Sequence, residues 1–559
     1  VMKNKTFLWS LLLGLLFVYS CSDDTPGLSV DLPEGASVVL EAQYGADSQL
    51  SFHASQAWTS KVETSDDDDV WLQVSPASGE AGDHKLTLSV ISPNDTGGER
   101  TATLTLMSGD SPLQITVRQE EYIRLDETTY QVSKEGGDLD INFHTTIAQG
   151  DFGVYSSANV DWITDRNATA TRVAESSYHI SLRVAPNEGN QSRSITYYFV
   201  KEPIDKTNLN PYILATATLV QAGQNSGTSE DYGEDGKVVV LQEHTVGDGI
   251  PLVLMGDGFI DTEIESGYYE EVMDKAVENL FTEYPISEMR DYFDIYCVKV
   301  VSSTNVFGTG ETALGCWMDS GTSTTVGGDH TTVQDYVKKV EGIDLENTQV
   351  VVILNSDAYK GSNYFFWYDG NNTPLDFCIA YFSVIGNLES EDFRRVLVHE
   401  TVGHGIGKLQ DEYAYEENPV IPDDEITQLR QQQEDFGWWL NVDFTDDPQE
   451  VLWSDFLSDT RYEGQGLGVF EGGATYLSGV WRPTEESMMN GNTPGFNAPS
   501  RRAIYTNIIE RGEGRTPDLE EFIDFDQRTY VAPTQTRAAT PSRPFARPQV
   551  VRLDRPLGE

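Results

Sequence analysis

Hydrophobic and polar positions follow one pattern in the first part of the chain and another after it. From residue 28 to about residue 225, short runs such as HKLTLSVI, TATLTLM and LQITVRQ alternate apolar with polar residues between clusters of Gly, Asn, Asp and Ser. This alternation is typical of antiparallel strands that bury one face. The closely spaced turn signals favour all-β sandwiches of Ig-like architecture.

The β-rich region contains an internal repeat. SVISPNDTGGERTATLTL is echoed by RVAPNEGNQSRSITYYF, and each copy leads into a strand that ends in glutamine. The shared positions are Pro93, Asn94, Arg100 and Gln119 in the first copy, and Pro186, Asn187, Arg193 and Gln221 in the second. A repeat of this length predicts two tandem β-sandwiches, at 28–120 and 121–225.

The pattern changes after a polar linker, GQNSGTSEDYGEDG. Apolar segments rich in β-forming residues (KVVVLQEH, IPLVLMGDGF, DIYCVKVVSS, TQVVVILN, DFCIAYFSV) alternate with stretches of helical periodicity at 261–284, 331–341 and 390–407. This alternation predicts an α/β layered domain, which we place at 235–525. Residues 526–559 are rich in Pro and Arg without periodicity, and they predict an extended C-terminal tail.

Charge excludes one class of partner. The 559 residues include 90 acidic and 37 basic ones, and the sequence pI is about 4.3. A surface this acidic repels a phosphate backbone, so nucleic acid is not an expected partner. Beyond Cys21, the sequence contains Cys297, Cys316 and Cys378. These three cysteines show no regular spacing and permit at most one disulfide among themselves.

The N-terminal residues 1–21 predict an exported protein. Lys3 and Lys5 precede the apolar run FLWSLLLGLLFVYS, which is too short for an ordinary membrane span. The tetrapeptide VYSC resembles a bacterial lipobox, which makes Cys21 the lipidated first residue of a mature lipoprotein; the alternative is an ordinary signal peptide. The acidic CSDD resembles the export signal of surface lipoproteins. We therefore expect an outer-membrane, cell-surface location with contact to the membrane through the lipid anchor only.

The texture of the two β-sandwiches resembles BACON domains, which are found in surface and secreted proteins and are proposed to bind carbohydrate or mucin. The resemblance implies glycan binding through these units. Trp58, Trp71 and Trp162 are either stacking platforms for sugars or, as we favour, core residues. The SDDDD run at 65–69 is either a calcium loop or, more simply, a solvated loop.

The hexapeptide HETVGH, from His399 to His404, is the main candidate for chemistry. Three residues separate Glu400 from His404, where the HExxH zinc signature has two. In a regular helix, at about 100° per residue, side chains five apart point about 140° away from each other and cannot share an ion. A local π-type widening restores the alignment, and Gly403 eases that distortion.

Two known motifs resemble this segment. HETVGH is similar in spacing and in its glycine to the HELLGH motif of dipeptidyl peptidase III. VHETVGHGIGKLQDEYA, together with MGDGF and GGATYLSGVWRPTEESMMN, resembles the IgA-peptidase family of zinc metallopeptidases over about residues 235–515. That family is similar to metzincins, so the resemblance implies a metzincin-like fold with Met489 in the methionine turn. The segment GNTPGFNAPSRR replaces a Cys-rich stretch of some family members.

The resemblance also implies roles for individual residues. His399 and His404 are zinc ligands and Glu400 is the general base that acts on zinc-activated water. Asp411 is the chosen third ligand, since the metzincin ligand position is occupied here by Gln410, a poor zinc ligand. The remaining candidates are Glu412, as an alternative third ligand or a residue that supports the ligands, and Tyr413 and Tyr476, as oxyanion donors or simply packed side chains, with Tyr476 preferred for catalysis.

The resulting hypothesis is a zinc-dependent metalloendopeptidase on the cell surface. Its substrates would be host or dietary proteins or glycoproteins, such as immunoglobulin A or mucin-like chains. One alternative is a glycan- or mucin-binding surface lipoprotein with an inactive peptidase-like domain. Another is a zinc hydrolase that does not cleave proteins.

Overall fold

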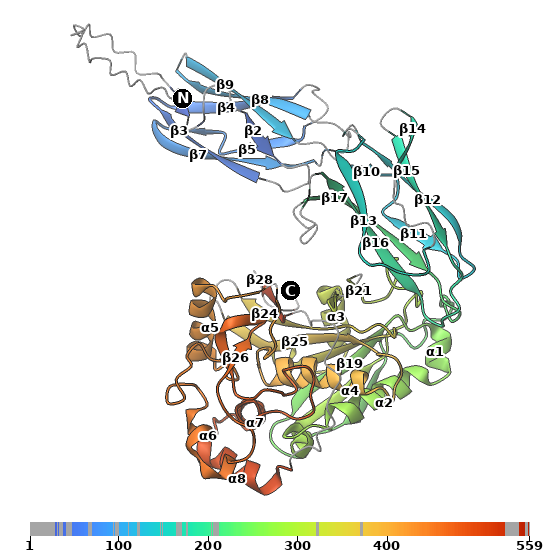
Figure 1. Cartoon of the computed structure of the whole chain (residues 1–559), viewed down its shortest axis with the longest axis vertical. Helices are drawn as coiled ribbons and strands as arrows, with labels where there is room; N and C mark the ends of the chain where they lie inside the picture. The colour runs from blue at the N-terminus through green and yellow to red at the C-terminus, as the bar shows by residue number, and fades with distance from the viewer. Residues whose placement is uncertain are drawn as a thin grey trace, which may run out of the picture.

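The computed structural model describes residues 28–531, 547–553 and 557, with internal gaps. Within these limits it leaves out 31, 33–36, 41–46, 65–69, 93, 95–99, 110, 120–122, 146, 148, 164–169, 175–176, 203, 205–211, 320–322, 369–372 and 417. The predicted lipidation site Cys21, the SDDDD run and most of the predicted tail lie outside the described residues. Figure 1 shows two β units followed by a larger α/β unit along the chain.

The first β unit is built from two sheets with a common core. One sheet has the order β1 (Leu28–Val30), β3 (Asp47–Ala54), β7 (Gly82–Val90) and β5 (Leu72–Ser75). The other has the order β2 (Val38–Leu40), β9 (Ser111–Gln119), β8 (Arg100–Ser108), β4 (Trp58–Thr64) and β6 (Ser78–Gly79). Alternate side chains of both sheets form one buried cluster, as the alternating sequence predicts.

The second β unit repeats this arrangement. One sheet has the order β10 (Arg124–Leu125), β12 (Gly137–His144), β15 (Ser177–Val184) and β14 (Thr171–Ala174). The other has the order β11 (Thr129–Val132), β17 (Ile213–Gln221), β16 (Arg193–Lys201) and β13 (Phe152–Ser156). Their inward side chains again form one core.

The repeated arginine and glutamine have the same structural role in both units. Arg100 Nε donates to Gln119 Oε1 at 2.7 Å, and its guanidinium lies 5.3 Å from the Trp71 ring centroid. In the second unit, Arg193 Nε donates to Gln221 Oε1 at 2.8 Å. Its guanidinium lies 4.5 Å from the ring of the equivalent tryptophan. The sequence repeat is therefore a repeat of one polar cluster.

The tryptophans considered as sugar platforms are buried instead. The exposed fractions of Trp58, Trp71 and Trp162 are 2%, 1% and 9%. Rings this deep in the core cannot stack on a sugar at the surface. The core interpretation of these three residues is correct.

The α/β unit is organised around a seven-stranded mixed sheet. Its order is β18 (Val238–Gln242), β20 (Phe293–Val298), β19 (Ile250–Asp257), β23 (Gln349–Leu354), β25 (Thr373–Ser383), β24 (Gly361–Tyr368) and β28 (Gln549–Leu553). Strands β20, β19, β23 and β25 are parallel neighbours, and β24 runs antiparallel to β25. The five apolar segments singled out in the sequence correspond to five of these strands.

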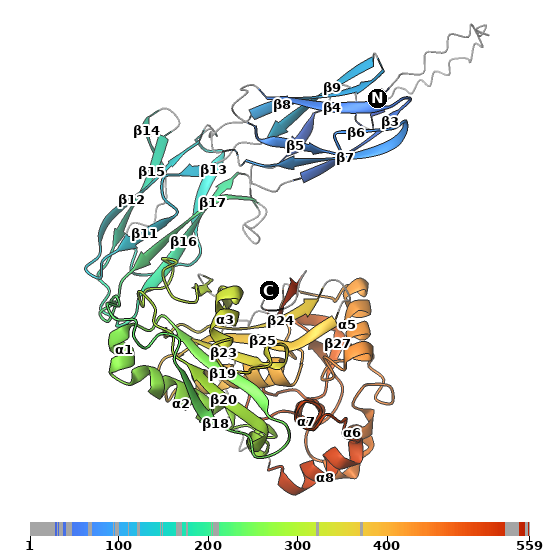
Figure 2. The same ribbon diagram turned by 180° about the vertical axis from the view of Figure 1, so that it is seen from behind.

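Helices cover one face of this sheet, and a thinner layer covers the other (Figure 2). The thicker core includes α2 (Tyr268–Leu280), α4 (Glu391–Leu397), the following π-helix (Val398–Ile406), α7 (Ala498–Glu513) and α8 (Leu519–Thr529). On the opposite face, α3 (His330–Val337) packs over the strands. Both faces of the central strands are buried, which explains their uninterrupted apolar sequences.

The remaining elements are short or peripheral. They are α1 (Asp261–Glu265), α5 (Asp423–Phe436), α6 (Ser454–Ser458), the hairpins β21 (Trp317–Met318) with β22 (Val326–Gly327) and β26 (Phe470–Gly473) with β27 (Tyr476–Arg482), and 3₁₀ turns at Ile286–Glu288, Arg290–Tyr292, Leu345–Asn347 and Thr460–Tyr462. The helix expected over 261–284 is divided into α1 and α2 by Gly267, whose φ is 84°. A left-handed residue ends one helix and starts another.

The predicted C-terminal tail needs a correction. It was placed at 526–559, but α8 continues to Thr529, and Gln549–Leu553 is a strand of the main sheet. The physical reason lies in the sequence QVVRL, whose β-branched pair fits a pleated edge next to β24. The nearby prolines made this short strand resemble an extended tail in the sequence.

Two further observations concern cysteines and membranes. Cys297, Cys316 and Cys378 are free thiols and all are buried. Within the part of the chain that the structure describes, no helix is long and apolar enough to cross a membrane.

Candidate metal centre

The segment that carries both histidines is a widened helix. Ser390 caps α4, because its hydroxyl accepts a hydrogen bond from the Asp392 amide, and the helix then passes directly into the π-helix Val398–Ile406. The structure therefore contains the wide turn that the five-residue spacing of His399 and His404 requires. The centroids of the two imidazole rings lie 4.8 Å apart.

A sharp reversal after the π-helix brings the acidic segment back to the histidines. The left-handed residue of this reversal is Lys408, with φ 49°. Its ammonium group lies 5.1 Å from the Phe365 ring and 5.4 Å from the Trp438 ring. Cation–π contacts of this kind stabilise a buried charge, and here they hold the reversal in place.

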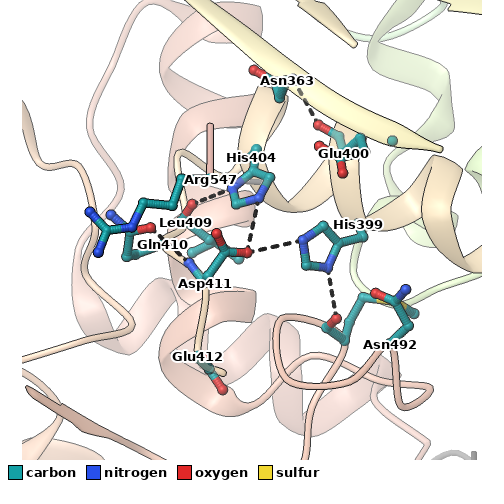
Figure 3. A network of polar contacts seen from close by, with 12 residues as sticks. Asn363, His399, Glu400, His404, Leu409, Gln410, Asp411, Glu412, Asn492 and Arg547 are labelled. Carbon is teal, nitrogen blue, oxygen red and sulfur yellow. Dashed lines mark hydrogen bonds and ion pairs between the residues drawn. The ribbon is translucent and has the colours of Figure 1, made fainter. Parts of the chain in front are cut away.

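Three potential ligands converge after the reversal (Figure 3). Asp411 Oδ1 lies 3.2 Å from His399 Nε2 and 3.2 Å from His404 Nε2. One ligand atom from each residue can be chosen so that all lie within 4.8 Å of one another, and all three side chains are buried. Burial alone would raise the pKa of Asp411, but when the two imidazoles are protonated they outweigh burial and hold that pKa well below its usual range. Two imidazole nitrogens and a carboxylate are a suitable donor set for a divalent metal.

Backbone carbonyls orient both imidazoles. His399 Nδ1 lies 3.0 Å from the carbonyl oxygen of Met488, and His404 Nδ1 lies 2.8 Å from that of Leu409. A carbonyl only accepts, so each Nδ1 carries the proton and each Nε2 presents its lone pair to the centre. Such outer contacts fix the tautomer of metal-binding histidines.

Glu400 is a buried carboxylate without a hydrogen-bond partner. It has no exposed surface, and among the described residues neither of its carboxylate oxygens accepts a hydrogen bond. Burial raises its pKa to about 8; His399 opposes this rise and Asp411 adds to it. A buried acid left unpaired is costly for the fold, so its presence beside the cluster indicates a chemical role.

Glu412 has a different environment from its neighbour. Its carboxylate accepts hydrogen bonds from Ser487 Oγ at 2.6 Å, Asn441 Nδ2 at 2.9 Å and Asn497 Nδ2 at 2.8 Å. Figure 3 shows Glu412 directed away from the histidines. The structure therefore brings Asp411, and not Glu412, to the cluster.

Met489 packs beneath the widened helix. The Glu412 amide donates to the Met489 carbonyl at 2.8 Å. A Cβ added to Gly403 would lie only 2.3 Å from Met489 Sδ. A glycine is thus needed at position 403 for close packing; that it also eases the widened turn stays a prediction.

The two tyrosine candidates differ in their distance from the centre. Tyr413 is partly buried, and its ring is stacked on His399 with centroids 6.3 Å apart. Burial, followed by the charge of Asp411, raises its pKa well above the ordinary value. Tyr476 instead donates its hydroxyl to Glu425 at 2.5 Å. Among the described contacts of Tyr476, none reaches a residue of the cluster.

Several supporting residues were missed in the sequence. Asn363 Nδ2 donates to the Glu400 carbonyl at 2.8 Å, and Asn441 and Asn497 bind Glu412. Each is an isolated asparagine far from HETVGH, so no local spacing identifies it. The aromatic run YFFWY, followed by DGNN, is a hairpin signal that could have located the strand of Asn363.

The α/β unit holds two histidines and an aspartate in a buried cluster, beside a buried glutamate. This arrangement is typical of metal-dependent hydrolases. Comparison with protein families agrees with this class. Residues 239–462 match the family described as IgA Peptidase M64, and residues 58–120 match the BACON family of N-terminal binding domains. The chain therefore contains a peptidase domain of the M64 family preceded by a BACON domain, as the resemblance indicated.

The matched ranges do not extend to every predicted feature. HETVGH and Asp411 lie inside the peptidase match, whereas Met489 lies beyond its end. The BACON match falls within the first β unit. That the second unit is also BACON-like stays a prediction, supported by the repeated Arg193 and Gln221 contact.

Other comparisons add little. A search of curated proteins found no match. Among solved structures, a Bacteroides ovatus GH5 xyloglucanase in complex with a XXXG heptasaccharide is 28% identical over 17% of this chain and 19% of that chain, with a TM-score of 0.15. The PapD-like domain 7 of human CEP192 is 10% identical over 20% of this chain and 96% of that chain, with a TM-score of 0.13. At these TM-scores the likenesses carry no argument about fold or function.

Proposed function

We propose that this protein is a zinc-dependent endopeptidase. The observation that carries the proposal is the unpaired, fully buried carboxylate of Glu400 beside His399, His404 and Asp411. Three protein ligands of this type leave a coordination position open, which is the arrangement of catalytic zinc sites. In a purely structural site, the nearby acid would be expected to have a partner.

The ligands and their supports have separate tasks. His399 and His404 would hold the ion through Nε2, since their Nδ1 atoms are occupied by carbonyls. Asp411 would be the third ligand, and Glu412 would anchor the segment that carries it to the 487–497 region. The fit is supported by Asp411 Oδ2, a buried oxygen with no hydrogen bond among the described residues.

The ion and Glu400 would have separate roles in cleavage of the peptide bond. A bound zinc ion supplies Lewis acidity, which polarises the peptide carbonyl and lowers the pKa of water. Glu400 would take a proton from the attacking water and donate it to the leaving amine, as a general base and then a general acid.

An accessory donor could stabilise the developing oxyanion. Tyr413 is the nearer candidate, because its ring is stacked beside His399. Tyr476, preferred from the sequence, would have to leave Glu425 before it could take this role.

The wider setting of the enzyme rests on the sequence. We place it on the outer cell surface, anchored by lipid on Cys21, with Ig-like β units that space or target a metzincin-like catalytic unit. Protein or glycoprotein substrates, with immunoglobulin A and mucin-like chains among them, agree with an exported peptidase linked to a BACON domain.

The test is to identify new N-termini after incubation of mucosal glycoproteins, including immunoglobulin A, with the chain from Ser22 onward. Glu400→Gln is the matched control, and zinc content is measured in both proteins. New termini produced only by the unsubstituted protein would support a peptidase and reveal its cleavage preference. Zinc-loaded protein that produces no termini, while it retains glycoproteins on a column, would support the alternative of a binding protein with an inactive peptidase-like domain.

A further inference from the structure

Strand β24 borders the candidate catalytic carboxylate. Asn363, within this strand, donates to the Glu400 carbonyl at 2.8 Å. A Cβ added to Gly361, the first residue of the strand, would lie 2.9 Å from Glu400 Oε1. An extended segment along the edge of β24 that faces away from β25 would therefore run beside the metal centre.

That edge is occupied by the chain's own C-terminal region. Strand β28 pairs with β24 in parallel, from Gln549 opposite Tyr364 to Leu553 opposite Tyr368. β28 is the last strand of the sheet, and its only strand neighbour in the described sheet is β24. Val551 and Leu553 pack against the core on the α3 face of the sheet, while Val550 is 44% exposed.

Arg547, just before β28, reaches to a second wall of the site. Its guanidinium donates to Thr475 Oγ1, to the Ala474 carbonyl and to Glu425 Oε1, each at 2.7 Å. It also lies 4.6 Å from the Tyr476 ring centroid. Figure 3 draws Arg547 next to the segment that carries the metal ligands.

This second wall is continuous with the ligand segment. The Ala474 amide donates to the Asp411 carbonyl at 2.8 Å, and the Thr475 amide donates to the Tyr413 carbonyl at 3.0 Å. The C-terminal segment thus connects β24, on one side of the centre, to the β26–β27 turn on the other.

The metal centre itself has no accessible surface. His399, Glu400, His404 and Asp411 are all 0% exposed. An extended peptide can bind to a sheet by adding a strand to a free edge, because the edge offers unpaired backbone donors and acceptors. Here the edge nearest the centre is already paired.

We propose that Arg547–Leu553 is a built-in inhibitory strand, and that the peptidase accepts an extended protein segment along β24 once this strand is displaced. This inference rests on the proposed peptidase function. The register explains how the inhibitor escapes cleavage: its pairing begins opposite Tyr364, beyond Gly361 and Asn363, which lie next to Glu400. Its release would also free Glu425 and Tyr476 from Arg547.

Matched single substitutions on β28 test this inference without truncation. Val551→Asp places a charge against the core and should release the strand, whereas Val550→Asp changes the adjacent, exposed position. With reduced, carboxymethylated casein as the probe, we expect the Val551→Asp protein to be faster by about tenfold or more, since only chains with the edge free accept substrate. The Val550→Asp protein should match the unsubstituted chain. Equal rates for all three proteins would overturn the inhibitory role.

Deletion of residues 547–559 and addition of the strand in trans provide the second arm. The deletion variant should be as fast as Val551→Asp, and a synthetic peptide spanning Arg547–Leu553 should slow both again. The same peptide with alanine for Arg547 should be the weaker inhibitor. Activation of the variants without inhibition by either peptide would overturn the proposed occupation of β24.

A measurement of metal release separates this inference from the proposed function. If no variant cleaves casein although zinc is bound, the peptidase proposal fails for this substrate class. The rate of zinc extraction by EDTA then tests whether β28 restricts access to the metal centre. Faster extraction from Val551→Asp than from Val550→Asp would support a strand that closes the centre. Equal extraction rates would overturn it.

Discussion

The β units and the metal centre both bury polar side chains, but they treat them in opposite ways. In the β units, Arg100 and Arg193 each donate to a glutamine and to at least one backbone carbonyl, and each lies over a tryptophan ring. In the centre, the Glu400 oxygens and Asp411 Oδ2 are buried without hydrogen bonds among the described residues. Satisfied polar clusters stabilise a fold, whereas unsatisfied ones are retained for binding or chemistry.

The largest effect that sharpens this comparison is expected at Glu400. Glu400→Gln should lower the cleavage rate by about 10²–10⁴-fold, because general acid–base catalysis contributes that much. Zinc content should stay the same, and thermal stability should not fall, since the carboxylate has no hydrogen-bond partner to lose. Rate assays, zinc analysis and thermal unfolding on one preparation check all three points. An unchanged rate would remove Glu400 as the base.

Asp411 and Glu412 are neighbours with opposite expectations. Asp411→Ala should lower zinc affinity by more than about 100-fold, beyond the loss typical of residues that only support a ligand. The stability of the metal-free protein should change little. Competition with a chromophoric chelator measures the affinity, and full zinc occupancy in this variant would transfer the ligand role elsewhere.

Glu412→Ala is the matched variant. It should destabilise the metal-free protein by about 1–3 kcal/mol, because it leaves buried donors of Ser487, Asn441 and Asn497 unpaired. Denaturant unfolding measures this loss. If Glu412→Ala abolished zinc binding without any loss of stability, the two neighbours would exchange roles.

Gly403 tests the close packing under the π-helix. Gly403→Ala should destabilise the protein by about 1–3 kcal/mol, as overpacked cores do, because the new methyl group meets Met489 Sδ. In a double-mutant cycle, Met489→Ala should recover part of this loss by making room. Full additivity of the two substitutions would show that the contact is not the cause.

The smallest effect is expected in the second β unit. Arg193→Ala should destabilise that unit by about 1.5 kcal/mol, the scale of a hydrogen bond to a charged group, and leave the cleavage rate unchanged. Arg183→Ala is the control: its pairing with Asp138 at 3.5 Å is highly exposed, so its loss should be within about 0.5 kcal/mol. Calorimetry that resolves the unfolding transition of the second β unit would measure the loss of stability in both variants. An equal effect of the two variants would contradict the comparison.

The parts of the site that are close together in the sequence could be predicted from it. His399, Glu400, His404 and Asp411 lie within thirteen consecutive positions, so helix geometry alone required a widened turn. The sequence could not distinguish Asp411 from Glu412 as the third ligand. The structure does, because the reversal at Lys408 determines which carboxylate points toward the histidines.

The parts that escaped prediction are distant in sequence. Asn363 and Arg547 reach the site through strand pairing and loop packing, and neither carries a local motif. Of the five strands predicted from apolar runs, β19, β23 and β25 are buried on both faces, which explains their long apolar runs, whereas β18 is a partly exposed edge strand. By contrast, β28 is short, lies at the edge of the sheet and has prolines nearby, so its composition resembled that of a tail.

The two carbonyls that orient the imidazoles belong to segments far apart in the chain, at Leu409 and Met488. An ion held by His399, His404 and Asp411 would therefore act as a cross-link between the π-helix, its return segment and the 488–489 turn. By mass action, an ion that binds only the folded chain raises its melting temperature with free-ion concentration. Melting curves recorded across a series of divalent ions would thus rank the metal preference of the site before any substrate is identified.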